Sequence, residues 1–123
     1  MSVAFAGYAA VFDRVDRAGD LMRRGAFAGA GAVPLLWQHR GAAVGTIEAI
    51  GEDARGLRVS GRVDDPELAA LVRGGAVAGL SVGYRAVAAT QGAYRELTAV
   101  DLVEVSLVAV PMQPLARVDL VGV

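Results

Sequence analysis

The chain has 123 residues, 54% of them hydrophobic, and a formal net charge of −1, which is the size of one domain with a modest core. The balanced charge argues against a nucleic-acid binder, which gathers basic residues on one face, and no apolar run reaches the roughly 18 residues that cross a membrane. With no cysteine and one histidine, the chain excludes a disulfide framework, a thiolate nucleophile and a multi-histidine metal centre, and we expect neither a metal nor a cofactor.

The hydrophobicity pattern predicts a mainly β chain that forms one domain over residues 1–123. Runs of apolar and β-branched residues predict strands, with turn-forming residues between them. Residues 21–30 predict a short extended piece followed by one helical turn. The predicted strands cover residues 3–12, 33–38, 43–50, 56–63, 78–89, 93–100, 102–110 and 116–121.

Residues 64–74 carry the clearest helix signal. Asp65 is a good N-cap, Pro66 fits the first helical position and Gly74 fits the C-terminal stop. Short strands at regular spacing around this one helix predict a small barrel or rolled sheet.

The polar segment of residues 13–20 predicts a loop. Its aspartates, Asp13, Asp16 and Asp20, have two interpretations, a cation site or a solvated loop. We favour the solvated loop, because arginines stand between the aspartates.

Three polar residues stand in apolar segments far apart in the sequence. His39 ends a predicted strand and is the only imidazole, and Ser81 lies in a run flanked by glycines. Glu104 has valine on both sides, and burying such a carboxylate unpaired costs about several kcal/mol. It is therefore either solvated or paired, and a histidine is a natural partner. A nucleophile, a base and an acid in separate strands are the pattern that a serine hydrolase needs.

Each of these residues also has a simpler structural interpretation. A lone histidine after an apolar strand is often only hydrogen-bonded and half-buried, and a serine between glycines is often a small core residue. The period of two in a strand places Glu104 and Ser106 on the same face, where they share a polar spot. An unrelated small β-barrel that binds an apolar ligand, with Trp37 and Tyr84 lining its pocket, is a rival interpretation of the whole chain.

Several segments in order carry a more specific pattern: GYAAVF at 7–12, GAF at 25–27, LLWQH at 35–39, GLSVGY at 79–84 and EVSLVAVP at 104–111. Together they resemble the prohead (capsid maturation) proteases of tailed phages, from about residue 5 to residue 117. That family is similar in turn to the herpesvirus assemblins. The resemblance implies a mainly β fold, a small assemblin-like closed or rolled β-barrel with one or two short helices.

The resemblance also implies a serine endopeptidase without cofactor or metal. Assemblins use a Ser-His-His triad in the chain order His, Ser, His; the first two match His39 and Ser81, and Glu104 stands where the block of the third member begins. The implied triad is Ser81, His39 and Glu104. The arginine pair of the assemblins is absent, because residues 111–114 read PMQP, so the oxyanion hole is unassigned. Arg85 is a candidate helper, with a surface role as the simpler interpretation.

Substrates and partners follow from the same resemblance. Such proteases cut the scaffold or the delta segment from the major capsid protein and digest themselves, inside the procapsid in the bacterial host cytoplasm. Assemblins act as dimers, so a homodimer is among the implied partners, whereas nucleic acid and membrane are not. The alternative is a catalytically inactive assemblin-like barrel that serves as a capsid assembly or scaffolding protein. Retention of His39, Ser81 and Glu104 argues against it.

Overall fold

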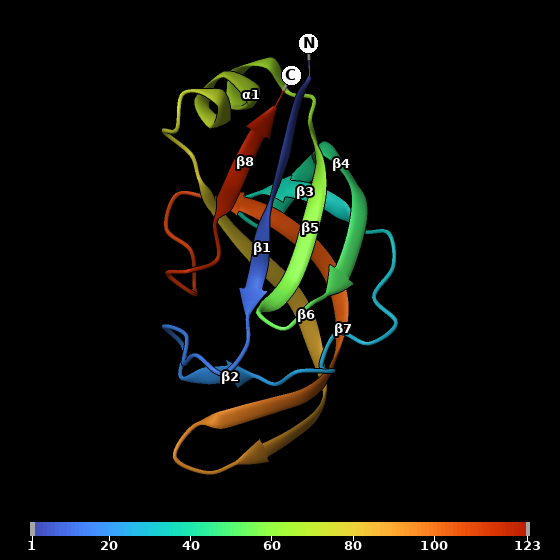
Figure 1. Ribbon diagram of the computed structural model, residues 1–123, viewed down its shortest axis with the longest axis vertical. Helices are drawn as coiled ribbons and strands as arrows, with labels where there is room; N and C mark the ends of the chain where they lie inside the picture. Colours follow the sequence, from blue (N-terminus) through green and yellow to red (C-terminus); the bar gives the residue numbers. More distant parts are fainter. Residues whose placement is uncertain (1, 123) are drawn as a thin grey trace.

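Eight strands and one helix make up residues 2–122, the part of the chain that this computed structural model describes (Figure 1). The mainly β fold class is as predicted. The elements are β1 (Val3–Val11), β2 (Asp20–Met22), β3 (Pro34–Trp37), β4 (Arg40–Glu52), β5 (Gly56–Val63), α1 (Pro66–Arg73), β6 (Gly79–Gln91), β7 (Arg95–Val108) and β8 (Val118–Gly122).

All strands belong to one sheet, in the order β2-β7-β3-β4-β5-β1-β8, with β6 paired to β7. The pairs among β1, β3, β4 and β5 are antiparallel, whereas β3 and β2 run parallel to β7. The sheet curves strongly, so that β6 and β7 cross behind β1 and β5 (Figure 1). Its strand order does not close on itself. The closed barrel among the predicted forms is therefore not confirmed, and the structure is an open, curved sheet.

Two backbone hydrogen bonds draw the ends of this sheet together. The N–H of Leu80 donates to the carbonyl of Ala116 at 3.0 Å, and the N–H of Val118 donates to the carbonyl of Ala78 at 2.8 Å. The start of β6 is thus fixed beside the start of β8.

One cluster of buried hydrophobic residues holds the two halves of the sheet together. It takes side chains from every strand from β1 to β7 and from α1. In β1 the burial alternates from Val3 to Gly7, as a strand with one face in the core requires. Five leucines are fully buried, and burying a leucine side chain contributes roughly 1.5–3 kcal/mol. They are Leu35, Leu57, Leu80, Leu97 and Leu107.

The helix α1 has the predicted ends. The carboxylate of Asp65 accepts a hydrogen bond from the Leu68 N–H at 2.9 Å, a proline occupies the first turn and Gly74 is the C-cap. Within residues 2–122, no helix has the length and hydrophobicity to span a membrane.

Two predicted elements differ from the structure. The predicted strands 93–100 and 102–110 are one strand, β7, because Asp101 pairs in register with Arg85 of β6 and points to solvent without interrupting the ladder. The helical turn predicted within 21–30 is wrong. That segment makes successive tight turns, because Gly25 and Gly29 have positive φ values of 91° and 79°, which interrupt a right-handed helix.

We expect Gly61→Ala to destabilise the sheet. Gly61 lies in β5 between β4 and β1, and a Cβ there would stand 2.1 Å from the carbonyl oxygen of Thr46. Because the backbone of β4 at Thr46 and Ile47 must shift, the variant should lose about 3 kcal/mol of unfolding free energy, or roughly 10 °C in Tm. Gly51→Ala is the matched control, since nothing lies within 4 Å of its Cβ position. Equal melting temperatures by circular dichroism for the two variants would contradict this packing.

Candidate active site

His39 lies in the two-residue turn between β3 and β4, two residues beyond Trp37, where β3 ends, whereas the predicted strand extended to residue 38. Trp37 pairs with Arg40, and the two turn residues, Gln38 and His39, have positive φ values of 53° and 64°. Two central residues with positive φ are typical of a type I′ turn, whose twist matches the hairpin. The conformation is uncommon for residues other than glycine, so the surroundings must hold it.

The end of β7 and the residue after it supply the groups that hold this turn. The N–H of Gln38 donates to the carbonyl of Leu107 at 3.0 Å, and the Gln38 side-chain oxygen accepts the N–H of Ala109 at 2.8 Å. The N–H of His39 donates to Ser106 Oγ at 3.0 Å. Three hydrogen bonds therefore fix the position of the histidine relative to β7.

Glu104 of β7 is buried, with 6% of its surface exposed, and its two oxygens have separate partners. Oε1 lies 2.5 Å from His39 Nδ1, and Oε2 accepts the Ser106 hydroxyl at 2.6 Å. These bonds compensate for the burial of the carboxylate. The pairing of Glu104 with the histidine and the polar spot shared with Ser106 are both present.

Gly83 of β6 makes room for this carboxylate. It pairs in register with Glu104, and a Cβ on Gly83 would lie 2.2 Å from Glu104 Oε1. The Glu104 side chain therefore lies over the glycine on its way to His39. The glycines on both sides of Ser81 are visible in the sequence, but no local pattern indicates that Gly83 makes room for the Glu104 side chain.

Ser81 of β6 stands opposite Ser106 of β7 and is 6% exposed. Its hydroxyl has no hydrogen bond to the rest of residues 2–122 and borders a pocket of about 120 Å³ whose wall also includes His39. The histidine and the serine thus face the same space without bonding to each other. Catalytic hydrogen bonds are often loose in a free enzyme and tighten when substrate binds.

Another wall of the pocket contains Asp20 of β2 and Tyr84 of β6. Asp20 is only 8% exposed, so the prediction of a solvated aspartate is wrong here. Its carboxylate accepts two hydrogen bonds from Arg95, at 2.9 and 2.8 Å, and one from the Tyr84 hydroxyl at 3.2 Å. The Arg95 hydrogen bonds lower the pKa of Asp20, and burial raises the pKa of Tyr84 to about 12.

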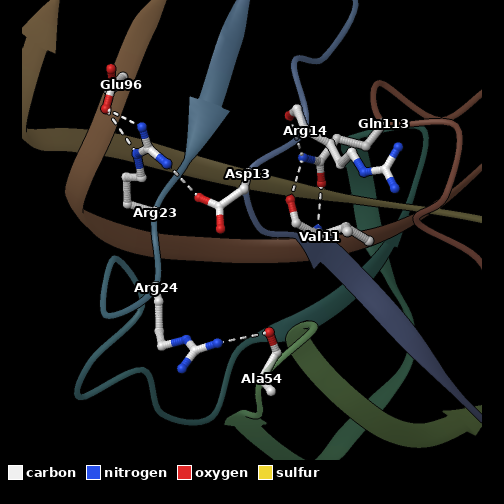
Figure 2. Close-up of polar contacts among 8 residues, drawn as sticks. All are labelled: Val11, Asp13, Arg14, Arg23, Arg24, Ala54, Glu96 and Gln113. Atoms are coloured by element: carbon white, nitrogen blue, oxygen red, sulfur yellow. Dashed lines mark hydrogen bonds and ion pairs between the residues drawn. The ribbon is translucent and has the colours of Figure 1, made fainter.

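The other two aspartates of residues 13–20, Asp13 and Asp16, have different partners. Asp13 is exposed and pairs with Arg23, which also bonds Glu96 (Figure 2), in agreement with the solvated interpretation. Asp16 accepts the backbone N–H groups of Ala18 and Asp20, both at 2.9 Å. Nowhere in residues 2–122 do three or more metal-ligating side chains gather in a way that suits a metal ion.

Gln113 holds residues 111–114 against the end of β1. Its buried amide accepts the N–H of Val11 at 2.7 Å and donates to the carbonyl of Val11 at 2.8 Å (Figure 2). Gln113 and Met112 border the pocket without supplying a cation. Arg85, the sequence candidate for a helper, is 79% exposed and lies 3.7 Å from Asp101, which is the surface role.

The rival interpretation as an apolar-ligand barrel required Trp37 and Tyr84 to line one pocket. Tyr84 borders the pocket of Ser81, whereas Trp37 borders a different hollow, together with Val44 and residues of α1. The two aromatic residues do not meet, so the structure does not support that interpretation.

The fold is shared with herpesvirus proteases. The KSHV protease, solved with a hexapeptide phosphonate inhibitor, has a TM-score of 0.69 over 100% of this chain and 66% of its own, at 13% sequence identity. The varicella-zoster virus protease has a TM-score of 0.63 over 99% of this chain and 64% of its own, at 18% identity. The fold is therefore that of the assemblin-type proteases.

Sequence comparison identifies the family to which the chain belongs. The chain belongs to the caudovirus prohead serine protease family, whose model matches residues 1–122. The prohead protease of Enterobacteria phage HK97 is 35% identical over 92 residues, a match that covers 65% of this chain and 41% of the phage protein. The chain thus spans about two fifths of that relative. The family resemblance predicted from the sequence is confirmed.

Proposed function

We propose that this protein is a serine endopeptidase of phage-type head maturation, with Ser81 as nucleophile, His39 as base and Glu104 as the group that orients the histidine. One observation carries the proposal: the imidazole that shares a pocket with the Ser81 hydroxyl is bound at Nδ1 by a buried carboxylate. Membership of the prohead protease family supports the same conclusion.

The chemistry follows from the two nitrogens of His39. With Nδ1–H donated to Glu104, the neutral ring leaves Nε2 as an acceptor. Nε2 takes the Ser81 proton as Oγ attacks the scissile carbonyl, and the imidazolium is stabilised by the Glu104 carboxylate. It then protonates the leaving amine. A water that gives its proton to the same nitrogen attacks the acyl-enzyme, which releases the acid and restores Ser81.

The substrate that suits this site is an extended segment of polypeptide. One edge of β6 pairs with β7, and the other bonds the segment before β8 only at its start, around Gly79 and Leu80. From Val82 onward, this second edge has no strand partner among residues 2–122. A free edge beside the nucleophile accepts an extended peptide as an added strand. A flexible delta or scaffold segment can adopt that form, whereas a folded domain cannot.

The partners and place of action that we propose are those of the family. The substrates are the major capsid protein, its delta or scaffold segment and the protease itself, inside the procapsid in the bacterial host. A homodimer is part of the same proposal. The alternative is the inactive assembly protein, which the labelling experiment distinguishes from the active enzyme.

Fluorophosphonate labelling with peptide mapping tests the activated serine. We expect the label on Ser81, at least 100-fold faster than in His39→Ala, because general-base catalysis contributes about 10²–10⁴-fold. Ser60→Ala is the control and should label normally, since Ser60 lies in β5 away from the pocket. A folded protein that takes no label on any serine and leaves a co-expressed capsid protein uncut would instead be the assembly protein.

A further inference from the structure

We propose that Ser106 is a positioning residue that ties the Glu104 carboxylate to the turn of His39. Its hydroxyl makes two hydrogen bonds, to Glu104 Oε2 at 2.6 Å and to the His39 N–H at 3.0 Å. The side chain is fully buried, at 0% exposure, so water does not compete for either bond. The inference rests on the proposed function for its effect on catalysis, but the geometry can be measured without activity.

The direction of each bond follows from the donors. The backbone N–H of His39 can only donate, so Ser106 Oγ accepts it and gives its single proton to Glu104. Glu104 Oε2 accepts that proton, and Oε1 accepts the Nδ1–H of the ring. The bonds form a closed ring from the His39 backbone through Ser106 and Glu104 back to the His39 side chain.

This ring has two consequences for the histidine. It restrains His39 at both its backbone and its imidazole, at a residue whose φ of 64° needs support from its surroundings. It also fixes the rotation of the Glu104 carboxylate, because both oxygens are bonded. Without the Ser106 hydroxyl, Glu104 Oε2 would be a buried acceptor with no donor. The carboxylate would then rotate away from His39 Nδ1 to reach another donor.

Nuclear magnetic resonance of the protein labelled with ¹⁵N-histidine tests this directly, since the chain has one histidine and gives one imidazole spectrum. For the native protein we expect a single low-field Nδ1–H resonance and a free Nε2. In Ser106→Ala the low-field proton should broaden or vanish while the far-ultraviolet circular dichroism stays native. Ser106→Thr, which restores a hydroxyl, should restore the resonance, and Ser60→Ala should leave it unchanged.

Kinetics give the second readout. Ser106→Ala should lower kcat on a peptide substrate about ten- to hundredfold, similar to the loss when an outer-shell partner of a metal-binding histidine is removed, with KM within about twofold. Should Ser106→Ala fail to fold, Ser106→Cys replaces it, because the thiol is a weak donor of similar size.

An unchanged low-field resonance in folded Ser106→Ala would overturn the positioning role, and so would an unchanged kcat. A native protein that cuts no peptide and takes no fluorophosphonate, yet loses the resonance in Ser106→Ala, would refute the proposed protease. That last result would leave the link from Ser106 to His39 intact.

Discussion

Ser81→Ala is expected to abolish cleavage and leave the fold intact. The Ser81 hydroxyl makes no hydrogen bond within residues 2–122, so its removal breaks no network, and the change from serine to alanine leaves the β6–β7 register in place. Removing the nucleophile should lower kcat by about 10⁴-fold or more. Co-expression with the capsid protein, followed by gel electrophoresis, measures the processing, and thermal unfolding checks the fold.

The other two proposed catalytic residues give graded controls for this experiment. His39→Ala should lower kcat as much as Ser81→Ala does. The double variant should lose no more activity than either single variant, because the effects of residues that act as one unit are not additive. Glu104→Gln should keep partial activity, because the amide oxygen still accepts the Nδ1–H of His39 but carries no charge. Complete processing of the capsid protein by Ser81→Ala would refute the assignment of the nucleophile.

Gly83→Ala is expected to inactivate the proposed protease, because the added methyl group displaces the side chain of Glu104. The new Cβ would lie 2.2 Å from Glu104 Oε1, 2.8 Å from Cδ and 3.0 Å from Cγ. Because these atoms lie at the far end of a flexible side chain, a rotation of the Glu104 side chain can relieve the clash. That movement breaks its bonds to His39 and Ser106. Activity should fall about 10³- to 10⁴-fold, on the scale of losing the orienting carboxylate in a serine protease.

A double-mutant cycle separates this explanation from general destabilisation. In a Glu104→Ala background, Gly83→Ala should cost little more activity, because the side chain that it displaces is already gone. Gly92→Ala, at the tip of the same β6–β7 hairpin, is the control, since the nearest atom lies 3.9 Å from its Cβ position. Multiplicative losses in the double variant would mean that Gly83 and Glu104 act independently.

Local sequence predicted the elements whose causes are local. The cap residues Asp65 and Gly74 fixed the ends of α1, because capping depends on neighbours three or four residues away. Runs of apolar and β-branched residues predicted the strands. The polar Asp101 was interpreted as a break between two strands, but it pairs with Arg85 within the continuous strand β7. The pairing of Glu104 with His39 was also predictable, since burial of an unpaired carboxylate is too costly.

The sequence by itself determined the mainly β class and the helix ends, and it marked Glu104 as a carboxylate that is either solvated or paired. Tertiary structure alone decided the positive-φ turn of His39, the clearance at Gly83 and the burial of Asp20, whose partner Arg95 lies 75 residues away. The reason is physical. Strand register sets which side chains face each other across a sheet, and register depends on the packing of the whole chain.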